Sequence, residues 1–307
     1  MRRCVVIGAN GQLGRALPLF FSTRHEVVAS VRRNPRPGQV LIDLSDIPSI
    51  TETLRKVSPD LILIAGAYAN VDQCEQEPTL CRQVNVEGPL EVARYAREAG
   101  SFVVYYSTDH VFDGSKNSCT ESDPVHPLNV YSRTKVEGEA VIRETVPGRH
   151  LILRTSWLYG PDPEERNFPL RCLQRLAAGE RVPVPSDQWG SPTYTEDLAN
   201  ATRLLLDRDQ TGTFHVTGPD FVNRYDYACR IAGRFEYPKD QLIPTPTAEL
   251  GQVARRALAV KLDCGKFEEL NGLPKRRGIM EGLSDLKRWR ESSERTPHSA
   301  SGRRKHL

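Results

Sequence analysis

The sequence predicts an α/β protein with a doubly wound parallel sheet and a smaller C-terminal region that binds a substrate. Three observations support this fold class. Short apolar, β-branched runs alternate with helical stretches through the first half of the chain. A glycine-rich turn directly follows the first of these runs. Beyond residue 150 the alternation loosens and prolines become frequent, which is typical of a loop-rich region above the sheet.

The predicted elements follow from the spacing of apolar residues. Strands separated by helices of this length pair in parallel through right-handed crossovers. Pro18 falls inside the first helix and is expected to kink or restart it. We expect strands at Arg3–Ile7, Glu26–Val31, Gln39–Asp43, Leu61–Ala65, Phe102–Tyr106, Leu151–Arg154 and Thr213–Val216, and helices at Leu13–Phe21, Ile47–Val57, Glu87–Ala99, Pro169–Ala178, Thr195–Leu206 and Tyr225–Phe235.

Length and charge divide the 307 residues further. We expect a dinucleotide-binding domain at 1–150, a substrate-binding region at 151–290, and a segment near 187–215 that returns to the first domain. The net charge of +3 equals the surplus of basic residues in the tail 292–307, which we expect to be disordered. The body is therefore formally neutral and offers no basic face for nucleic acid.

The lengths of the apolar runs and the spacing of the cysteines indicate in which cellular compartment the protein is expected. No run of about 18 apolar residues exists, and the apolar start after Met1 is too short for a signal peptide, so we expect no membrane contact. The seven cysteines include no C-x-x-C pair, and the nearest two are seven residues apart. Free thiols in the cytoplasm are the expected state, without a disulfide framework or metal site.

The segment Gly8-Ala-Asn-Gly-Gln-Leu-Gly14 predicts the cofactor site. Gly8 permits a tight turn, Gly11 admits a pyrophosphate close to the backbone, and Gly14 allows the helix to pack against the strand. The helix N-terminus supplies free N–H groups to the anion. A Rossmann-type domain follows, with this set of cofactor-binding residues: Gly8, Asn10, Gly11, Gln12, Leu13 and Gly14.

The residues after the second and third predicted strands indicate which dinucleotide binds. Arg32 stands where an NAD-specific site carries an acidic residue, and a guanidinium suits the 2′-phosphate of NADP. We therefore expect NADP(H), with NAD(H) as the open alternative, since Arg32 and Arg33 also fit a solvated turn. Asp43 and Leu44 are placed to border the adenine.

The catalytic candidates come from a Y-x-x-x-K motif. Tyr131 and Lys135 lie four residues apart on a predicted helix, so their side chains share one face. A neighbouring cation favours the phenolate and thereby lowers the tyrosine pKa. Thr108 ends the fifth predicted strand and brings a hydroxyl to the edge of the sheet where ligands bind.

These motifs, with Ser107-Thr-Asp-His-Val-Phe-Asp-Gly114 and Arg154-Thr-Ser-Trp-Leu-Tyr-Gly160, resemble the dTDP-4-dehydrorhamnose reductase family of extended short-chain dehydrogenases. The resemblance runs from about residue 3 to 290 and includes Asp187-Gln-Trp-Gly-Ser-Pro-Thr193. It implies reduction of dTDP-4-dehydro-L-rhamnose to dTDP-L-rhamnose. The residues that it carries over are Thr108, Tyr131 and Lys135 for catalysis, Gly11–Leu13, Ala65, Gly66 and Ala67 for the cofactor, and Thr108, Asp109 and Trp157 for the substrate.

Several departures leave the sugar open. His110 replaces a usual tyrosine and is expected to pack rather than to catalyse, Ile64 replaces a usual asparagine, and Ala257 a usual proline. A different nucleotide-linked 4-keto sugar is one alternative. Another is a non-catalytic subunit similar to the β-subunit of methionine adenosyltransferase, although Thr108, Tyr131 and Lys135 favour an enzyme. A homodimer is left open, and the motifs specify no metal ligand.

Overall fold

Seven parallel strands form one sheet in the computed structural model, which describes residues 2–270 and 275–295. Their order is β11-β6-β5-β4-β1-β2-β3, with β1 registered on β2 from Arg2↔His25 and on β4 from Cys4↔Leu61. The order reverses at β1, which makes its carboxyl end the topological switch point. The strands are β1 (Arg2–Ile7), β2 (His25–Val31), β3 (Gln39–Leu41), β4 (Leu61–Ile64), β5 (Phe102–Thr108), β6 (His150–Thr155) and β11 (Gly212–His215).

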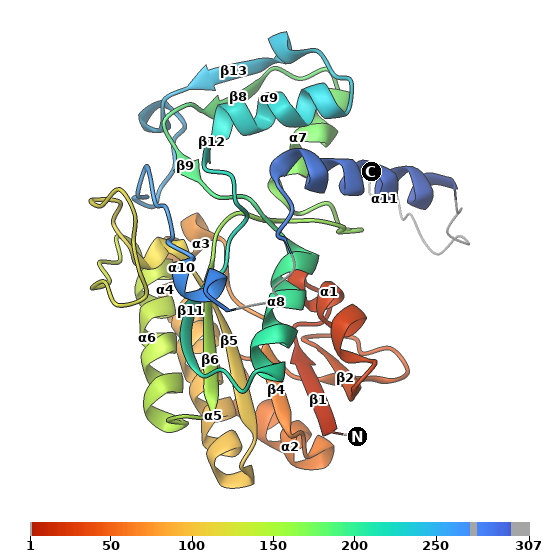
Figure 1. Ribbon diagram of the computed structural model, residues 1–307, viewed down its shortest axis with the longest axis vertical. Coiled ribbons are helices and arrows are strands. Elements are labelled where there is room, and N and C mark those ends of the chain that lie inside the picture. The colour runs from red at the N-terminus through yellow and green to blue at the C-terminus, as the bar shows by residue number, and fades with distance from the viewer. Residues whose placement is uncertain (1, 271–274, 296–307) are drawn as a thin grey trace.

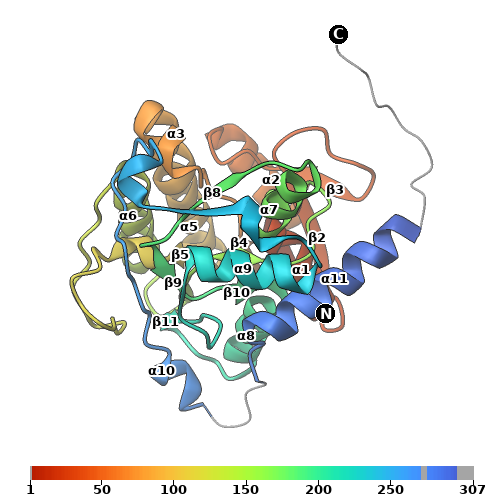
Figure 2. The ribbon, with the colours of Figure 1, turned by 90° about the horizontal axis from the view of Figure 1, so that it is seen from above.

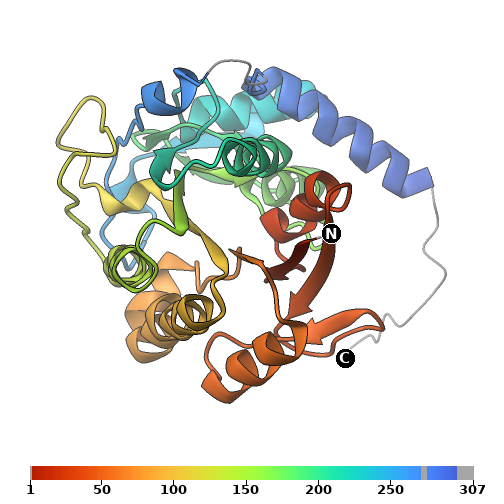
Figure 3. The same cartoon turned by 60° about the horizontal axis from the view of Figure 1, so that its bottom comes forward.

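Helices cover both faces of the sheet, because alternate residues of each strand point to opposite sides. Cys4 and Val6 belong to the core beneath α1 and α8, whereas Val5 and Ile7 belong to the core beneath α2, α5 and α6. Figure 3 shows these two helical layers on either side of the sheet. The helices are α1 (Gln12–Phe21), α2 (Ile47–Val57), α3 (Val71–Gln76), α4 (Pro78–Arg82), the π-helix η1 (Gln83–Glu87), α5 (Gly88–Ala99), the 3₁₀ turn η2 (Asp109–Val111), α6 (Val130–Thr145) and α8 (Thr195–Asp207).

A smaller region lies above the carboxyl ends of the sheet (Figure 1). It has apolar clusters of its own, built around α7 and α9. Figure 2 shows α9 lying across the sheet when the molecule is seen from above. This region contains β7 (Leu158–Tyr159), α7 (Phe168–Ala177), β8 (Val182–Pro185), β9 (Trp189–Gly190), β10 (Thr193–Tyr194), β12 (Val222–Asn223), α9 (Arg224–Arg234), η3 (Lys239–Gln241), β13 (Leu242–Thr245), η4 (Thr247–Glu249) and α11 (Ile279–Arg295). Helix α10 (Gly265–Glu268) instead packs beside β11 of the main sheet.

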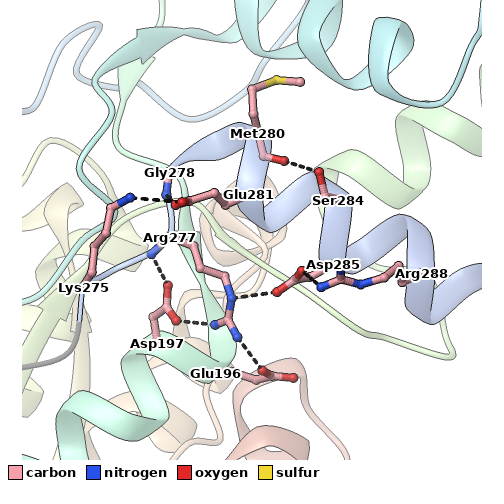
Figure 4. Close-up of polar contacts among 10 residues, drawn as sticks. All are labelled: Glu196, Asp197, Lys275, Arg277, Gly278, Met280, Glu281, Ser284, Asp285 and Arg288. Atoms are coloured by element: carbon pink, nitrogen blue, oxygen red, sulfur yellow. Dashed lines mark hydrogen bonds and ion pairs between the residues drawn. The ribbon is translucent and has the colours of Figure 1, made fainter.

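Arg277 joins the two regions through carboxylates of α8 and α11 (Figure 4). Its Nε donates to Asp285 at 2.8 Å and one Nη donates to Glu196 at 3.2 Å. The other Nη pairs with Asp197, whose second oxygen accepts the Arg277 backbone N–H at 2.7 Å. These three carboxylates raise the pKa of Arg277 against the opposing effect of burial, so the cation stays charged as a tie between α8 and α11.

Three expectations about the elements need correction. Of the two alternatives for Pro18, a kink or a restart, the restart is wrong: α1 continues through it, and packing of Leu13 and Leu17 on the sheet offsets the hydrogen bond that proline removes. Strand β3 ends at Leu41, so Asp43 and Leu44 lie beyond it. Residues 292–295, expected to be disordered, form the last turn of α11, and the rest of that tail lies outside the described residues.

Two sequence-based expectations can be compared directly with the described residues. All seven cysteines are free thiols, as expected. No described helix is long and apolar enough to cross a bilayer.

Candidate active site

A cavity of about 1040 Å³ lies between the carboxyl edge of the sheet and the region above it. The sheet side contributes the glycine loop and the ends of β4, β5 and β6, while α6 adds the catalytic candidates. The upper side contributes residues of α7, β9 and α9. The predicted site residues that line this cavity are Gly11, Gln12, Leu13, Ala65, Ala67, Asp109, Tyr131, Lys135 and Trp157.

The glycine loop is shaped by close backbone contacts. Gly8 has φ +83°, and a Cβ there would lie 2.7 Å from the backbone of Gly66 at the end of β4. A Cβ on Gly14 would overlap the carbonyl oxygen of Gly8. Gly8 and Gly14 therefore allow the close backbone packing beneath the turn. Gly11 lines the cavity and donates its N–H to the Gly8 carbonyl at 2.9 Å.

The first turn of α1 is suited to an anion. Gly11 caps it without a side chain, and no acidic residue lies in the first turn. The side-chain oxygen of Gln12 is buried without a hydrogen-bond partner among the described residues. The free N–H groups and the positive end of the helix dipole fit the pyrophosphate of a dinucleotide.

The predicted adenosine-side residues lie around this loop rather than in the cavity. The Ala9 N–H donates to the Ser30 carbonyl at 2.9 Å, which sets the end of β2 beside the glycine loop. Arg32 follows β2, is exposed, and pairs with no described residue. Asp43 accepts the Ser45 N–H and hydroxyl at 2.9 and 2.7 Å. Leu44 is buried, and the Cβ position of Gly66 lies 3.4 Å from its Cδ1.

Asn10 connects the glycine loop to the upper region. Its carbonyl accepts from Arg15 at 3.0 Å and from Arg166 at 2.8 Å. Glu164 pairs with both guanidiniums at 3.1 Å, and buried Asp162 accepts from Arg166. The Asn10 backbone is thus fixed by a loop about 150 residues further along the chain, a contact that the local pattern does not predict.

Tyr131 and Lys135 occupy adjacent turns of α6, which begins at the Asn129 cap. Lys135 is 2% exposed, donates to the Tyr106 carbonyl at 2.7 Å, and lies 3.8 Å from the centre of the Tyr105 ring. Burial lowers the pKa of Lys135 to about 7.

The Tyr131 pKa differs from the expectation for a tyrosine beside a cation. Burial and the Asp109 carboxylate raise it, and the hydrogen bond with Thr108 lowers it by less. Lys135 is directed to the Tyr106 carbonyl instead of the phenol. Tyr131 is therefore held as a protonated hydroxyl, the form that donates a proton.

Thr108 and Asp109 form a connected pair at the end of β5. The Thr108 hydroxyl donates to Asp109 at 3.0 Å and accepts the His110 N–H at 3.2 Å. Asp109 also accepts the Ser156 hydroxyl at 2.6 Å and is 4% exposed. Thr108 is not among the residues that line the cavity but hydrogen-bonds Tyr131, which is, and His110 packs edge-on against Tyr131 with ring centres 6.0 Å apart.

Trp157 is held in a strained conformation at the cavity wall. Its φ of +43° is rare for a bulky residue and indicates that the surroundings determine it. Arg224 lies over the indole, 3.3 Å from the ring centre, and Tyr227 stacks on it at 6.4 Å. A side chain at Gly190 would meet this indole at 2.5 Å, so the glycine leaves the ring its space.

Sequence reasoning missed the arginines of the upper wall. Arg171 of α7 and Arg224 of α9 line the cavity and form no ion pair with a described residue. Burial lowers the pKa of Arg224 to about 9, with the Arg171 and Arg256 charges adding to this effect. Two guanidiniums without an ion-pair partner among the described residues suit an anionic ligand group. The residue before Arg224, Asn223, is the N-cap of α9, and in the sequence it indicates only that a helix begins there.

Comparisons with known proteins give consistent relationships. A profile described as the RmlD substrate binding domain matches residues 1–305. The chain is 34% identical to a dTDP-4-dehydrorhamnose reductase of Escherichia coli, over 86% of this chain and 90% of that protein. It is 33% identical to methionine adenosyltransferase 2 subunit beta of Mus musculus, over 95% and 91%.

Solved structures extend the comparison to the fold. The crystal structure of a Bacillus anthracis dTDP-4-dehydrorhamnose reductase in complex with NADP matches with a TM-score of 0.84 and 29% identity. The match covers 93% of this chain and 98% of that one. A UDP-glucose 4-epimerase of Thermus thermophilus in complex with NAD, at 20% identity and TM-score 0.79, shares the fold.

Proposed function

Because the chain belongs to the RmlD substrate binding domain family, we propose that it is an NADPH-dependent reductase of a nucleotide-linked 4-keto-6-deoxy sugar. The reaction adds a hydride to C4 and a proton to the oxygen on that carbon. The substrate that we favour is dTDP-4-dehydro-L-rhamnose, with dTDP-L-rhamnose as product. The names of the reductase relatives support this choice.

One observation carries the proposal: the Tyr131–Lys135 pair lines the same cavity as the glycine loop. A dinucleotide whose pyrophosphate is held at Gly11 would extend into the cavity that Tyr131 also lines. Bound NADPH supplies the hydride. The chain's own residues must then deliver the proton and hold the sugar.

Tyr131 is the proton donor in this mechanism. Its raised pKa keeps the hydroxyl protonated until negative charge develops on the C4 oxygen. Thr108 hydrogen-bonds the same oxygen after turning its hydroxyl from Asp109, to which it donates at 3.0 Å. Lys135 binds the ribose next to the nicotinamide and, when charged, favours the phenolate left on Tyr131.

The upper wall binds the nucleotide portion of the substrate. Arg171 and Arg224 are suited to the diphosphate, because neither is neutralised by a described carboxylate. Trp157 and its stacked Arg224 form the side of the sugar pocket. Residues 1–291 have no formal net charge, so the anionic substrate is attracted by these arginines and not by the charge of the whole protein.

The β-subunit relatives support a second candidate, a regulatory subunit of a methionine adenosyltransferase. Tyr131, Lys135 and Thr108 are all present here, and a purely regulatory role requires none of their hydroxyl or amine chemistry. We therefore rank the reductase first.

The experiment follows NADPH absorbance with purified protein and dTDP-4-dehydro-L-rhamnose. We expect turnover with this sugar and less with UDP- or GDP-linked 4-keto sugars. NADPH binding without turnover of any of these sugars, together with capture of a methionine adenosyltransferase catalytic subunit, would favour the second candidate.

A further inference from the structure

Two buried cysteines meet behind the catalytic helix. Cys74 lies in α3 and Cys81 in α4, and both side chains are fully buried. Residues seven apart in one continuous helix would be about 10.5 Å apart along its axis. The chain leaves the helical conformation at Glu77, with φ −125° and ψ 58°, so α4 turns back toward α3. The two sulfurs come to 2.9 Å and share a hydrogen bond.

This separation suits a disulfide better than a shared metal. Two thiolates on one tetrahedral zinc ion lie about 3.8 Å apart, as follows from Zn–S bonds of about 2.3 Å. No cluster of three or more metal-ligating side chains occurs among the described residues. Closing a disulfide of about 2.05 Å requires the sulfurs to approach by less than 1 Å.

The surroundings of Cys81 favour its thiolate. The Thr134 hydroxyl lies 3.3 Å and the Asn85 amide 3.4 Å from its sulfur. The hydrogen bond with Cys74 contributes most to lowering the pKa of Cys81 to about 7; these two groups and the nearby Lys135 charge add to it, and burial opposes it. Thiolate is the nucleophilic form of cysteine, so Cys81 is the sulfur expected to react first.

The pair is connected to the active site by short links. Thr134 precedes Lys135 in α6, and the Asn85 amide donates to the Thr134 hydroxyl at 3.1 Å. Asn85 also exchanges hydrogen bonds with the backbone of Tyr68, in the loop after β4 that faces the cofactor side. The first residues of α3 line the cavity itself.

We propose that Cys74 and Cys81 form a reversible redox site that regulates cofactor binding, with a hydroperoxide as the oxidant. The Cys81 thiolate attacks the peroxide, the O–O bond breaks, and the leaving oxygen departs as water or alcohol after taking up a proton. Cys74 then attacks the resulting sulfenic acid. The S–O bond breaks, and the hydroxyl leaves as water with the Cys74 proton.

Local opening gives the oxidant access. Helix α3 has six residues, too few to be stable alone, and Glu77 separates it from the continuous helical stretch 78–99 that begins with α4, so α3 can open without global unfolding. Because α3 begins at the cavity wall, a bound dinucleotide should slow the oxidation.

The test treats the full chain with hydrogen peroxide, alkylates the remaining thiols and maps peptides by mass spectrometry. We expect a Cys74–Cys81 cross-linked peptide, at least fivefold weaker NADPH binding, and recovery with dithiothreitol. Prior addition of NADPH should slow the cross-link. These readouts need no sugar turnover, so they are separable from failure of the proposed reductase activity.

Matched variants make the test specific. Cys81→Ser should lose the peroxide response, and Cys81→Ala repeats this test without burying a hydroxyl. Cys229→Ser removes a more exposed thiol and should respond as the wild type does. Oxidation of Cys229 without the 74–81 cross-link would overturn the proposal, as would a cross-link that leaves NADPH affinity unchanged.

Discussion

The two walls of the cavity are built in different ways. The wall that we propose to bind the cofactor, called the cofactor wall, is a local structure: Gly8, Gly11 and Gly14 lie within seven residues, and their backbone shapes it. The wall that we propose to bind the substrate, called the substrate wall, is assembled from side chains of Trp157, Arg171 and Arg224, which distant segments bring together. A single added methyl group, as in a glycine-to-alanine substitution at Gly8 or Gly14, is therefore enough to disturb the first wall. The second depends on charge and ring stacking.

In the proposed function this difference has a reason, because the first wall binds a pyrophosphate, which all dinucleotides share, and the second binds a sugar nucleotide, which varies. Backbone N–H groups of a helix start recognise a pyrophosphate regardless of what is attached to it. Side chains on loops above the sheet can change without disturbing the strands. Tyr131 and Lys135, the groups proposed to react, lie on α6 and line the same cavity.

The largest expected effect comes from Tyr131→Phe. Removing only the hydroxyl takes away the proton donor, so kcat should fall about 10²–10⁴-fold while NADPH binding is kept. Tyr159→Phe is the matched control, since its hydroxyl is buried outside the cavity without a described partner. Steady-state kinetics with the nucleotide sugar checks this, and equal kcat values for both variants would remove Tyr131 from the mechanism.

The proposed role of the substrate wall is tested by Arg224→Met, which removes one of its two guanidiniums. Losing a charge-assisted contact to the diphosphate should weaken dTDP binding by about 10- to 150-fold, equivalent to about 1.5–3 kcal/mol. NADPH affinity should stay the same. Arg230→Met, on the same helix but outside the cavity, is the control. Calorimetric titration of both ligands measures the effect, and equal weakening of both ligands would place Arg224 in general packing.

The dinucleotide preference is tested by Arg32→Asp. An exposed guanidinium without a described partner is free to meet a 2′-phosphate, and reversing its charge should move the preference in kcat/KM toward NADH. The expected change is about 10-fold, at the low end of a charge-assisted hydrogen bond. Arg36→Asp makes the same charge change on the neighbouring loop. Equal use of NADPH and NADH by the wild type would contradict the role of Arg32.

The importance of close backbone packing in the cofactor wall is tested by comparing Gly8→Ala with Gly38→Ala. Both glycines have φ +83°, so both variants carry the same backbone strain. Only Gly8 has neighbours at its Cβ position, 2.7 Å away. Gly8→Ala should therefore lose about 1–3 kcal/mol more unfolding free energy and bind NADPH more weakly. Urea denaturation compares them, and equal losses would show that close packing at Gly8 is unimportant.

The sheet and its glycine loop could be predicted because the sequence patterns that specify them lie within short stretches of the chain. The glycine spacing and the alternation of strands and helices predicted β1, α2 and the carboxyl-edge position of the cavity. Helix α3 was missed because its six residues leave no helical period to detect, and the helix predicted from Glu87 in fact begins at Pro78, through α4 and η1. Arg224 was missed because its partner ring, Trp157, lies 67 residues earlier in the chain.

The most direct test of the reductase proposal follows the hydride itself. NADPH labelled with deuterium at C4 of the nicotinamide, on each face in turn, is mixed with the protein and dTDP-4-dehydro-L-rhamnose. For one label, the sugar product should be about 1 Da heavier, with deuterium at C4 of the sugar and one NADP⁺ formed per product. Binding of NADPH without transfer of label to the sugar from either face would contradict the proposal.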